Sequence, residues 1–354
     1  IAQSNKNYSA QRGMQVTGST ISDHQFQQAL EAIESENASA IEKAEMLMEI
    51  AMGLQQKPKS AKQLHDAIAL YDRAIELCQD TGAELVARIR ARKGTALQAI
   101  PDSGPDFLLK AESEFEVALS LLQETGKAEE IAEINMNLGL VLHNLTGFNK
   151  SKITDAISAY QRALRTFTRE NYPTEFAILH NNLATAYLSI PMTDERGKMR
   201  EALAVQSFEE ALKIITIEEQ PSEYAMLQNN LGNALQYVSS SHAIENNLRA
   251  LDAYDEALKV RTSTDTPFEY ANTLCNKANC LRNLPDDVED ADAGNREHLV
   301  EARTMYREAK DIYQQYGDLG RVSIIDEVLA EIEQDLGTGH AGSRDGKGFG
   351  ASRI

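Results

Sequence analysis

Residues 221–258 read PSEYAMLQNNLGNALQYVSSSHAIENNLRALDAYDEAL, and near-copies of this unit recur along most of the chain. Its second half contains Ala250, Tyr254 and Ala257 at positions i, i+4 and i+7, a spacing that places them on one face of a helix. Its first half contains Gly232, followed three residues later by Leu235. The stretch therefore predicts one helix, a polar turn and a second helix.

The second half repeats as the pattern A-x-x-x-[YF]-x-x-A. Two alanines let a neighbouring helix approach closely, and the aromatic residue between them buries a large apolar area. The full copies are Ala67/Tyr71/Ala74, Ala111/Phe115/Ala118, Ala156/Tyr160/Ala163, Ala204/Phe208/Ala211, Ala250/Tyr254/Ala257 and Ala302/Tyr306/Ala309. A partial copy at Phe26 and Ala29 predicts an additional helix at the N-terminal end.

The first half repeats as a small residue with a large apolar residue three positions later. The small residues are Ala51, Gly94, Gly139, Ala184, Gly232 and Ala278, about 45 residues apart. A glycine inside a helix costs roughly 1 kcal/mol relative to alanine, so its use at this position indicates close helix packing. In the last four copies an asparagine stands two residues before the small residue.

Together these patterns resemble the tetratricopeptide-repeat family over residues 23–336. The resemblance implies an all-α fold, a right-handed superhelical solenoid of six helix-turn-helix repeats with N- and C-terminal capping helices. The period exceeds the family's 34 residues, and the family's tryptophan is absent because the chain contains none. Residues 173–186 and 221–234 look like the longer repeats of bacterial signalling-associated and kinesin-light-chain-type proteins.

The helix pairs are expected at 39–79, 82–124, 127–169, 174–219, 222–262 and 267–316. Pro173, Pro221 and Pro267 each open a first helix, where a missing N–H costs little. Residues 319–336 predict a last amphipathic helix that covers the end of the array. Residues 1–22 and the glycine-rich, basic residues 337–354 are expected to be flexible, and the latter segment is either a plain tail or a docking peptide.

The formal net charge of −19 argues against nucleic acid and anionic membranes as partners. It favours a basic or neutral protein partner, although the charge could equally serve only solubility. Three cysteines within predicted helices indicate a reducing compartment, hence the cytoplasm. No apolar run is long enough for a membrane span, and the first residue, Ile1, leaves a processed N-terminus open.

No catalytic or cofactor-binding motif is apparent. The histidines do not have metal-ligand spacing, and Cys275 and Cys280 are too far apart for a C-x-x-C site. The acidic run that begins at Asp286 offers oxygen ligands for calcium, but a solvated loop is the favoured interpretation. We therefore expect a protein without enzymatic activity and without a cofactor.

The resemblance also implies that the first helices line a concave, peptide-binding groove. The implied lining residues are Met136, Leu140, His143, Asn181, Asn182, Thr185, Asn229, Asn230, Asn233, Gln236, Asn276, Asn279 and Arg282, and Leu188 and Cys275 share their spacing. An amide offers two donors and an acceptor, so a ladder of amides suits an extended peptide backbone. Ligand contact is expected above all from Asn181, Asn229, Asn233 and Asn279. Cross-linking of neighbouring helices is the open alternative for Asn137, Asn182, Asn230 and Asn276.

These features predict an interaction scaffold or adaptor that captures an extended, basic or neutral segment of another protein. The alternative is a dedicated accessory subunit or assembly chaperone of a larger enzyme complex. The tail carries Arg344, Lys347 and Arg353, so it could itself occupy the groove, either in its own chain or in a second copy.

Overall fold

The computed structural model describes residues 30–31, 33, 35–78, 82–101, 103–123, 126–190, 195–238, 242–290 and 293–338. Within these residues every regular element is a helix, which confirms the all-α prediction. The chain divides into two compact units, Ile1–Asn182 and Leu183–Ile354. The expected flexible segment 1–22, the additional helix around Phe26 and Ala29, and the tail from residue 339 lie outside the described residues.

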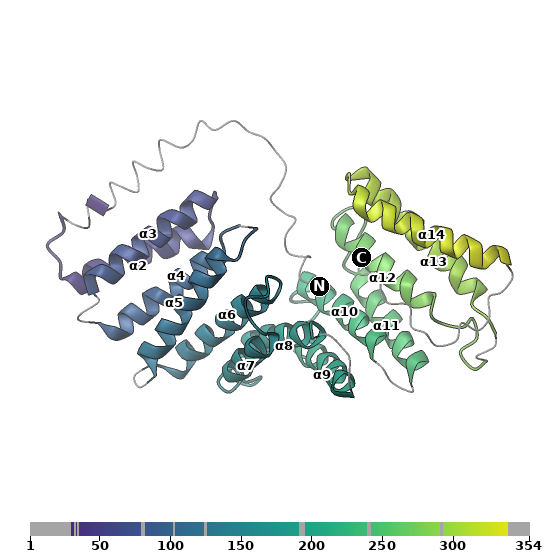
Figure 1. The fold of residues 1–354 in the computed structure, drawn as a ribbon, viewed down its shortest axis with the longest axis horizontal. Helices are drawn as coiled ribbons and strands as arrows, with labels where there is room; N and C mark the ends of the chain where they lie inside the picture. The colour runs from purple at the N-terminus through teal and green to yellow at the C-terminus, as the bar shows by residue number, and fades with distance from the viewer. Residues whose placement is uncertain are drawn as a thin grey trace. The chain divides into compact units, whose positions relative to one another are not determined.

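The N-terminal unit is built from helix pairs (Figure 1). Its helices are α2 (Ala40–Gln56), α3 (Ala61–Cys78), α4 (Ala83–Gln98), α5 (Asp106–Leu122), α6 (Ala128–Thr146) and α7 (Ile153–Ala163). The two helices of each pair pack against each other, and α3 and α5 pack against the first helix of the following pair. The first helices α2, α4 and α6 also contact one another in sequence order. This nearest-neighbour packing is typical of a repeat array.

The C-terminal unit continues the same arrangement. After α8 (Pro173–Leu188), which spans the boundary between the units, come α9 (Glu195–Leu212), α10 (Pro221–Tyr237), α11 (Ala243–Leu258), α12 (Pro267–Leu281), α13 (Arg296–Gln315) and α14 (Leu319–Thr338). Helix α10 packs on α9 and α11, α12 packs on α10, α11 and α13, and α14 packs on α13. Helices α8, α10 and α12 begin at prolines, as predicted.

Three helices end earlier than the sequence predicts: α9 ends at Leu212 instead of residue 219, α11 ends at Leu258 instead of residue 262, and α7 is the third. Helix α7 ends at Ala163, whereas the pair was expected to extend to residue 169. The chain turns after Ala163, and Phe167 is buried with its ring 5.1 Å from that of Tyr172 between centroids. Burying the apolar ring of Phe167 favours the turn over a continued helix.

The repeated alanines and aromatics form the core of every pair. All twelve alanines of the A-x-x-x-[YF]-x-x-A pattern are fully buried, and the six aromatic side chains are at most 1% exposed. We call each of these aromatics, with the small residue of its first helix, a seam. Large buried side chains dominate packing energetics, so the pattern that predicts the fold is also the one that holds each pair together.

Glycine at the small position is required by close approach of the ring. A Cβ built on Gly139 would lie 2.5 Å from the Tyr160 ring, and one on Gly232 would lie 2.6 Å from the Tyr254 ring. A Cβ atom essentially never makes a non-bonded contact this short, so the ring or the helix would have to move. The prediction that these glycines permit close packing is confirmed.

We expect Gly139→Ala to destabilise the protein. Overpacking typically costs about 1–3 kcal/mol, which outweighs a helix-propensity gain of roughly 1 kcal/mol. Gly53→Ala is the matched control, because Gly53 lies in α2 and its added Cβ would meet nothing within 4 Å. Urea denaturation should show opposite signs for the two variants, and stabilisation by both would mean that the seam tolerates a methyl group.

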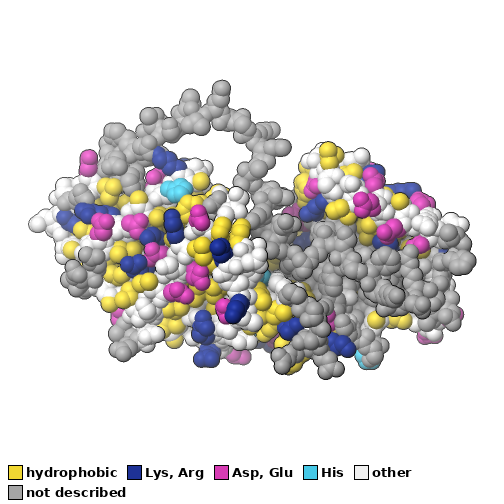
Figure 2. All heavy atoms as spheres, in the orientation of Figure 1, with side chains coloured by type: hydrophobic (Ala, Val, Ile, Leu, Met, Phe, Trp, Pro, Cys, Tyr) yellow, Lys and Arg dark blue, Asp and Glu magenta, His cyan; other side chains and the backbone are white. Residues whose placement is uncertain are grey.

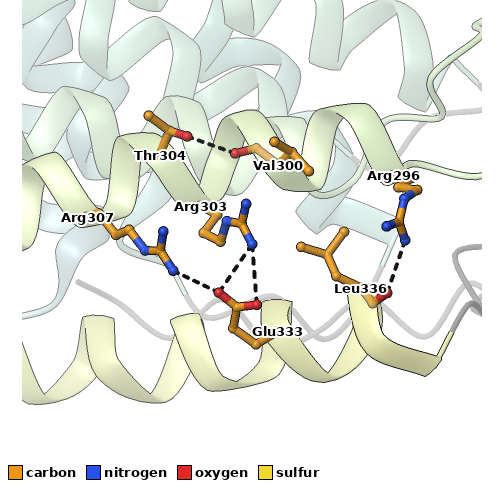
Figure 3. A network of polar contacts seen from close by, with 7 residues as sticks. All are labelled: Arg296, Val300, Arg303, Thr304, Arg307, Glu333 and Leu336. Atoms are coloured by element: carbon orange, nitrogen blue, oxygen red, sulfur yellow. Dashed lines mark hydrogen bonds and ion pairs between the residues drawn. The ribbon is translucent and has the colours of Figure 1, made fainter.

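Helix α14 closes the C-terminal end, as predicted. Val322, Ile325 and Ile332 are buried in one cluster with Tyr306 and Tyr313. Polar contacts lie along the edge of this packing (Figure 3). Glu333 of α14 forms ion pairs with Arg303 (3.3 Å) and Arg307 (2.9 Å) of α13, and Arg296 donates a hydrogen bond to the backbone oxygen of Leu336 (3.0 Å).

We expect the apolar contact, not the ion pairs, to attach α14. Ile325 is fully buried, so Ile325→Ala should cost about 2–5 kcal/mol. Glu333 is about half exposed, so Glu333→Gln should cost no more than about 1 kcal/mol. Denaturation curves of the two variants test this ranking, and an equal or larger loss for Glu333→Gln would contradict it.

Candidate functional site

The first helices α10 and α12 of the C-terminal unit present a set of amide side chains. We define the amide face as Asn230, Asn233 and Gln236 of α10 with Asn276 and Asn279 of α12. All five side chains are half-buried. They occupy the positions that the sequence predicts for groove lining.

Hydrogen bonds connect the amide face to the core. The Tyr254 hydroxyl donates to Oδ1 of Asn233 (2.8 Å) and accepts from Nε2 of Gln236. Nδ2 of Asn279 donates to Oε1 of Gln236 (3.2 Å). This relay joins α11, α10 and α12, so it satisfies a buried hydroxyl and fixes the orientation of surface amides at once.

Asn229 does not line a groove, contrary to the sequence-based expectation of ligand contact. Its side chain is 5% exposed, and its Oδ1 accepts hydrogen bonds from Oγ1 of Thr273 (3.2 Å) and Nδ2 of Asn276 (3.1 Å). Both partners belong to α12, so Asn229 bridges two first helices. Asn276 therefore fits the cross-linking alternative, although it uses a side-chain oxygen as its acceptor.

Cys275 is likewise a core residue. It is 1% exposed and packs in the cluster beneath α14. Burial raises the pKa of its thiol to about 12, so the thiol stays protonated at neutral pH and is a poor nucleophile. Arg282, at the end of α12, forms an ion pair with Glu331 of α14 (2.8 Å).

Several groups of the amide face remain open to a ligand. Within the described residues, the side chain of Asn230, Nδ2 of Asn233 and Oδ1 of Asn279 have no hydrogen-bond partner. None of these atoms is among the fully buried unsatisfied ones, so water can reach them. The face thus offers both donors and acceptors to an incoming backbone.

The remaining predicted lining residues lie on α6 and α8. Met136, Leu140 and His143 of α6 are half-buried, and burial lowers the pKa of His143. Asn181, Asn182 and Thr185 of α8 are also half-buried, as is Leu188. Nδ2 of Asn181 lies 3.5 Å from Oδ1 of Asn182, and Oδ1 of Asn181 is buried without a hydrogen-bond partner among the described residues.

A cavity of about 200 Å³ between α2, α4 and α6 was not anticipated from the sequence. Its lining includes Met48 and Met52 of α2, Ala91 and Thr95 of α4, and Ile134 of α6. The sequence signal exists: residues three before and one after the small residue are Met48 and Met52 in the first pair, and Ala91 and Thr95 in the second. The groove lining predicted from the sequence covers only the last four pairs.

The acidic turn before α13 serves as a helix cap. Both carboxylate oxygens of Asp286 accept backbone hydrogen bonds, from Glu297 (2.9 Å) and His298 (3.0 Å). Across the part of the chain that the structure describes, no cluster of three or more His, Cys, Asp or Glu side chains could hold a metal ion. None of the described helices is long and apolar enough to cross a membrane.

Comparison with known proteins gives similarities to solved structures only. No protein-family model matches the sequence, and neither does any curated protein. The structure of YrrB, a tetratricopeptide-repeat protein with an unusual peptide-binding site, is 20% identical with a TM-score of 0.39, covering 67% of this chain and 92% of YrrB. BtubC from P. vanneervenii is 18% identical with a TM-score of 0.40, covering 82% of this chain and 99% of BtubC.

A polar residue four positions after the small residue meets the seam hydroxyl in two pairs. The hydroxyl of Tyr71 donates to Oε1 of Gln55 (2.8 Å), as Tyr254 contacts Gln236. In the second pair this position holds Gln98, but the seam residue is Phe115 and lacks a hydroxyl. Oε1 of Gln98 is accordingly buried with no hydrogen-bond partner in the described residues.

We therefore expect Phe115→Tyr to stabilise the protein and Tyr254→Phe to destabilise it. The first change supplies the donor that Gln98 lacks, and the second removes one that Asn233 uses. Each effect should amount to about 0.5–1.5 kcal/mol, the usual net value of a hydrogen bond. Urea denaturation of both variants checks the signs, and a destabilised Phe115→Tyr variant would show that Gln98 is not placed for the hydroxyl.

Proposed function

We propose that this protein is a non-catalytic interaction scaffold that binds an extended segment of another protein along the first helices of its repeats. The observation that carries the proposal is the amide face, where open donors and acceptors stand on a framework held by the Tyr254 relay. An extended segment presents backbone N–H and C=O groups along its whole length. Amides can bind such groups without reading the side chains of the ligand.

Pre-organisation makes this face suited to binding. Gln236 is held from three directions, by Tyr254, Asn279 and the backbone oxygen of Asn276 (3.4 Å). A ligand therefore does not have to order these side chains, which would otherwise cost about 0.5–1.5 kcal/mol for each one immobilised. The open groups of Asn230, Asn233 and Asn279 can then contribute to affinity more fully.

The net charge of the protein can discriminate between ligand segments, which the amides cannot do. The chain carries a formal net charge of −19, which attracts basic segments, repels acidic ones and raises the association rate of the former. On the face seen in Figure 2, acidic and basic side chains are interspersed among the described residues. The proposed partner is thus a basic or neutral extended segment, and the chain's own tail, with Arg344, Lys347 and Arg353, is a candidate competitor for the same face.

The test uses peptides selected for binding to the whole chain from a random displayed library. The double variant Asn230→Ala with Asn279→Ala should weaken their affinity about tenfold, since two net hydrogen bonds amount to roughly 1–3 kcal/mol. Neither asparagine satisfies a fully buried group, so the melting temperature should stay within a few degrees. Fluorescence anisotropy of labelled peptides measures the affinity.

The control for that variant is Gln314→Ala with Gln315→Ala, which removes two exposed amides from the second helix α13. This control should bind the selected peptides as the parent does. Association of basic peptides should also slow as salt is raised. Equal affinity for the amide-face variant and the parent would show that peptides bind elsewhere.

A further inference from the structure

The cavity of the N-terminal unit has an apolar lining and a charged rim. Met48, Met52, Leu122 and Ile134 supply the apolar part from α2, α6 and the end of α5. Its volume of about 200 Å³ is below the roughly 300–1,000 Å³ of sites for drug-sized ligands. It is therefore the size for an anchoring side chain rather than a cofactor. Two flexible methionines let such a cavity accept apolar side chains of varied shape.

The charged part of the lining consists of two arginines and two glutamates. The Arg88 guanidinium pairs with Glu130 (2.7 Å) and more loosely with Glu84 (3.7 Å), and Arg92 pairs with Glu133 (3.1 Å). Each lining arginine thus pairs with a lining glutamate, and the second partner of Arg88, Glu84, lies outside the lining. The paired charges of the lining are therefore neutral overall, so a preference between acidic and basic ligands has to come from a group that stays unpaired.

One rim oxygen lacks a partner. Oε1 of Glu130 accepts the hydrogen bond from Nε of Arg88. Oε2 of Glu130 is buried and has no hydrogen bond to any of the described residues, a state that costs free energy for an anionic oxygen. An incoming N–H donor, especially a cationic one, would remove that cost.

We propose that this cavity is a second docking site, which takes a large apolar side chain of an extended segment while an adjacent lysine or arginine of that segment binds Glu130. The inference rests on the proposed peptide-binding function and names the kind of anchor that the N-terminal unit accepts. The apolar side chain gains from burial against Met48, Met52 and Ile134. The basic side chain supplies orientation through a charge-assisted hydrogen bond.

The experiment uses the full chain labelled with ¹³C at the methionine methyl groups. The chain has nine methionines, and the signals of Met48 and Met52 are assigned with Met48→Leu and Met52→Leu variants. The probes are short capped Gly-Ser peptides that carry Leu-Lys, Leu-Glu, Leu-Ser or Ala-Lys at the centre. The Leu-Lys peptide should shift both methyl signals and bind about tenfold more tightly than the Leu-Glu or Ala-Lys peptide.

Two variants separate the apolar and charged contributions. Ala91→Phe places a ring in the cavity and should abolish the shifts at Met48 and Met52, while an unchanged thermal midpoint shows that the chain still folds. Glu130→Gln should remove the preference for Leu-Lys over Leu-Ser but keep the preference for leucine over alanine. Glu129→Gln is the matched control on the same helix, because Glu129 is exposed and does not line the cavity, and it should keep both preferences.

The outcomes bear on this site alone. Tighter binding of Leu-Glu than of Leu-Lys, equal shifts from all four peptides, or no shift from any of them would each overturn the proposal. So would an unaltered lysine preference in Glu130→Gln. Binding at the amide face is read separately through the Asn230 and Asn279 variant, so failure here is distinguishable from failure of the proposed function.

Discussion

The contact between the seam aromatic and the small residue of the first helix is the constraint on which each repeat depends. In the third pair the Tyr160 ring lies so close to Gly139 that no side-chain atom fits between them. This contact fixes both the separation of the two helices and the rotation of the first helix about its axis. Because the rotation is fixed, this one contact determines which of the residues around Gly139 are buried and which are exposed. The same argument applies to Gly232 and Tyr254 in the fifth pair.

The seam also connects the core to the surface that we propose binds peptides. Tyr254 is fully buried, yet its hydroxyl contacts Asn233 and Gln236 on the amide face. Orientation of these amides is therefore tied to the packing of the pair rather than left to solvent. Where the seam residue is Phe208 instead, the residue four after the small position is Leu188, which needs no partner. Core and surface chemistry are matched in those pairs. Among the described residues, Oε1 of Gln98 in the second pair and the Tyr160 hydroxyl in the third are buried without a hydrogen-bond partner.

Local periodicity made the fold predictable, whereas contacts between pairs limited prediction of the site. Alanine and aromatic spacing within one helix identifies its buried face, and prolines identify the starts of α8, α10 and α12. The burial of Asn229 depends on Thr273, a residue of the following pair. No pattern within one repeat distinguishes an asparagine that bridges two helices from one that faces a ligand. The cavity of the N-terminal unit likewise requires side chains from three pairs to be placed together.

The net charge of the protein does not show which of its basic residues are engaged in ion pairs. Helix α4 carries Arg88, Arg90, Arg92 and Lys93, so its sequence alone would suggest a positively charged surface. Each of them pairs with a carboxylate of another helix, Arg90 and Lys93 both with the largely buried Glu114. Ion pairs at exposed positions contribute little to stability, with a typical value of about 0–1 kcal/mol, but they determine which charges remain available to a partner. With its cations engaged, α4 presents no unpaired positive charge to an acidic segment, while Oε2 of Glu130 still lacks a donor. The preference for basic ligands that we propose then rests on this oxygen of Glu130, in addition to the overall charge of −19.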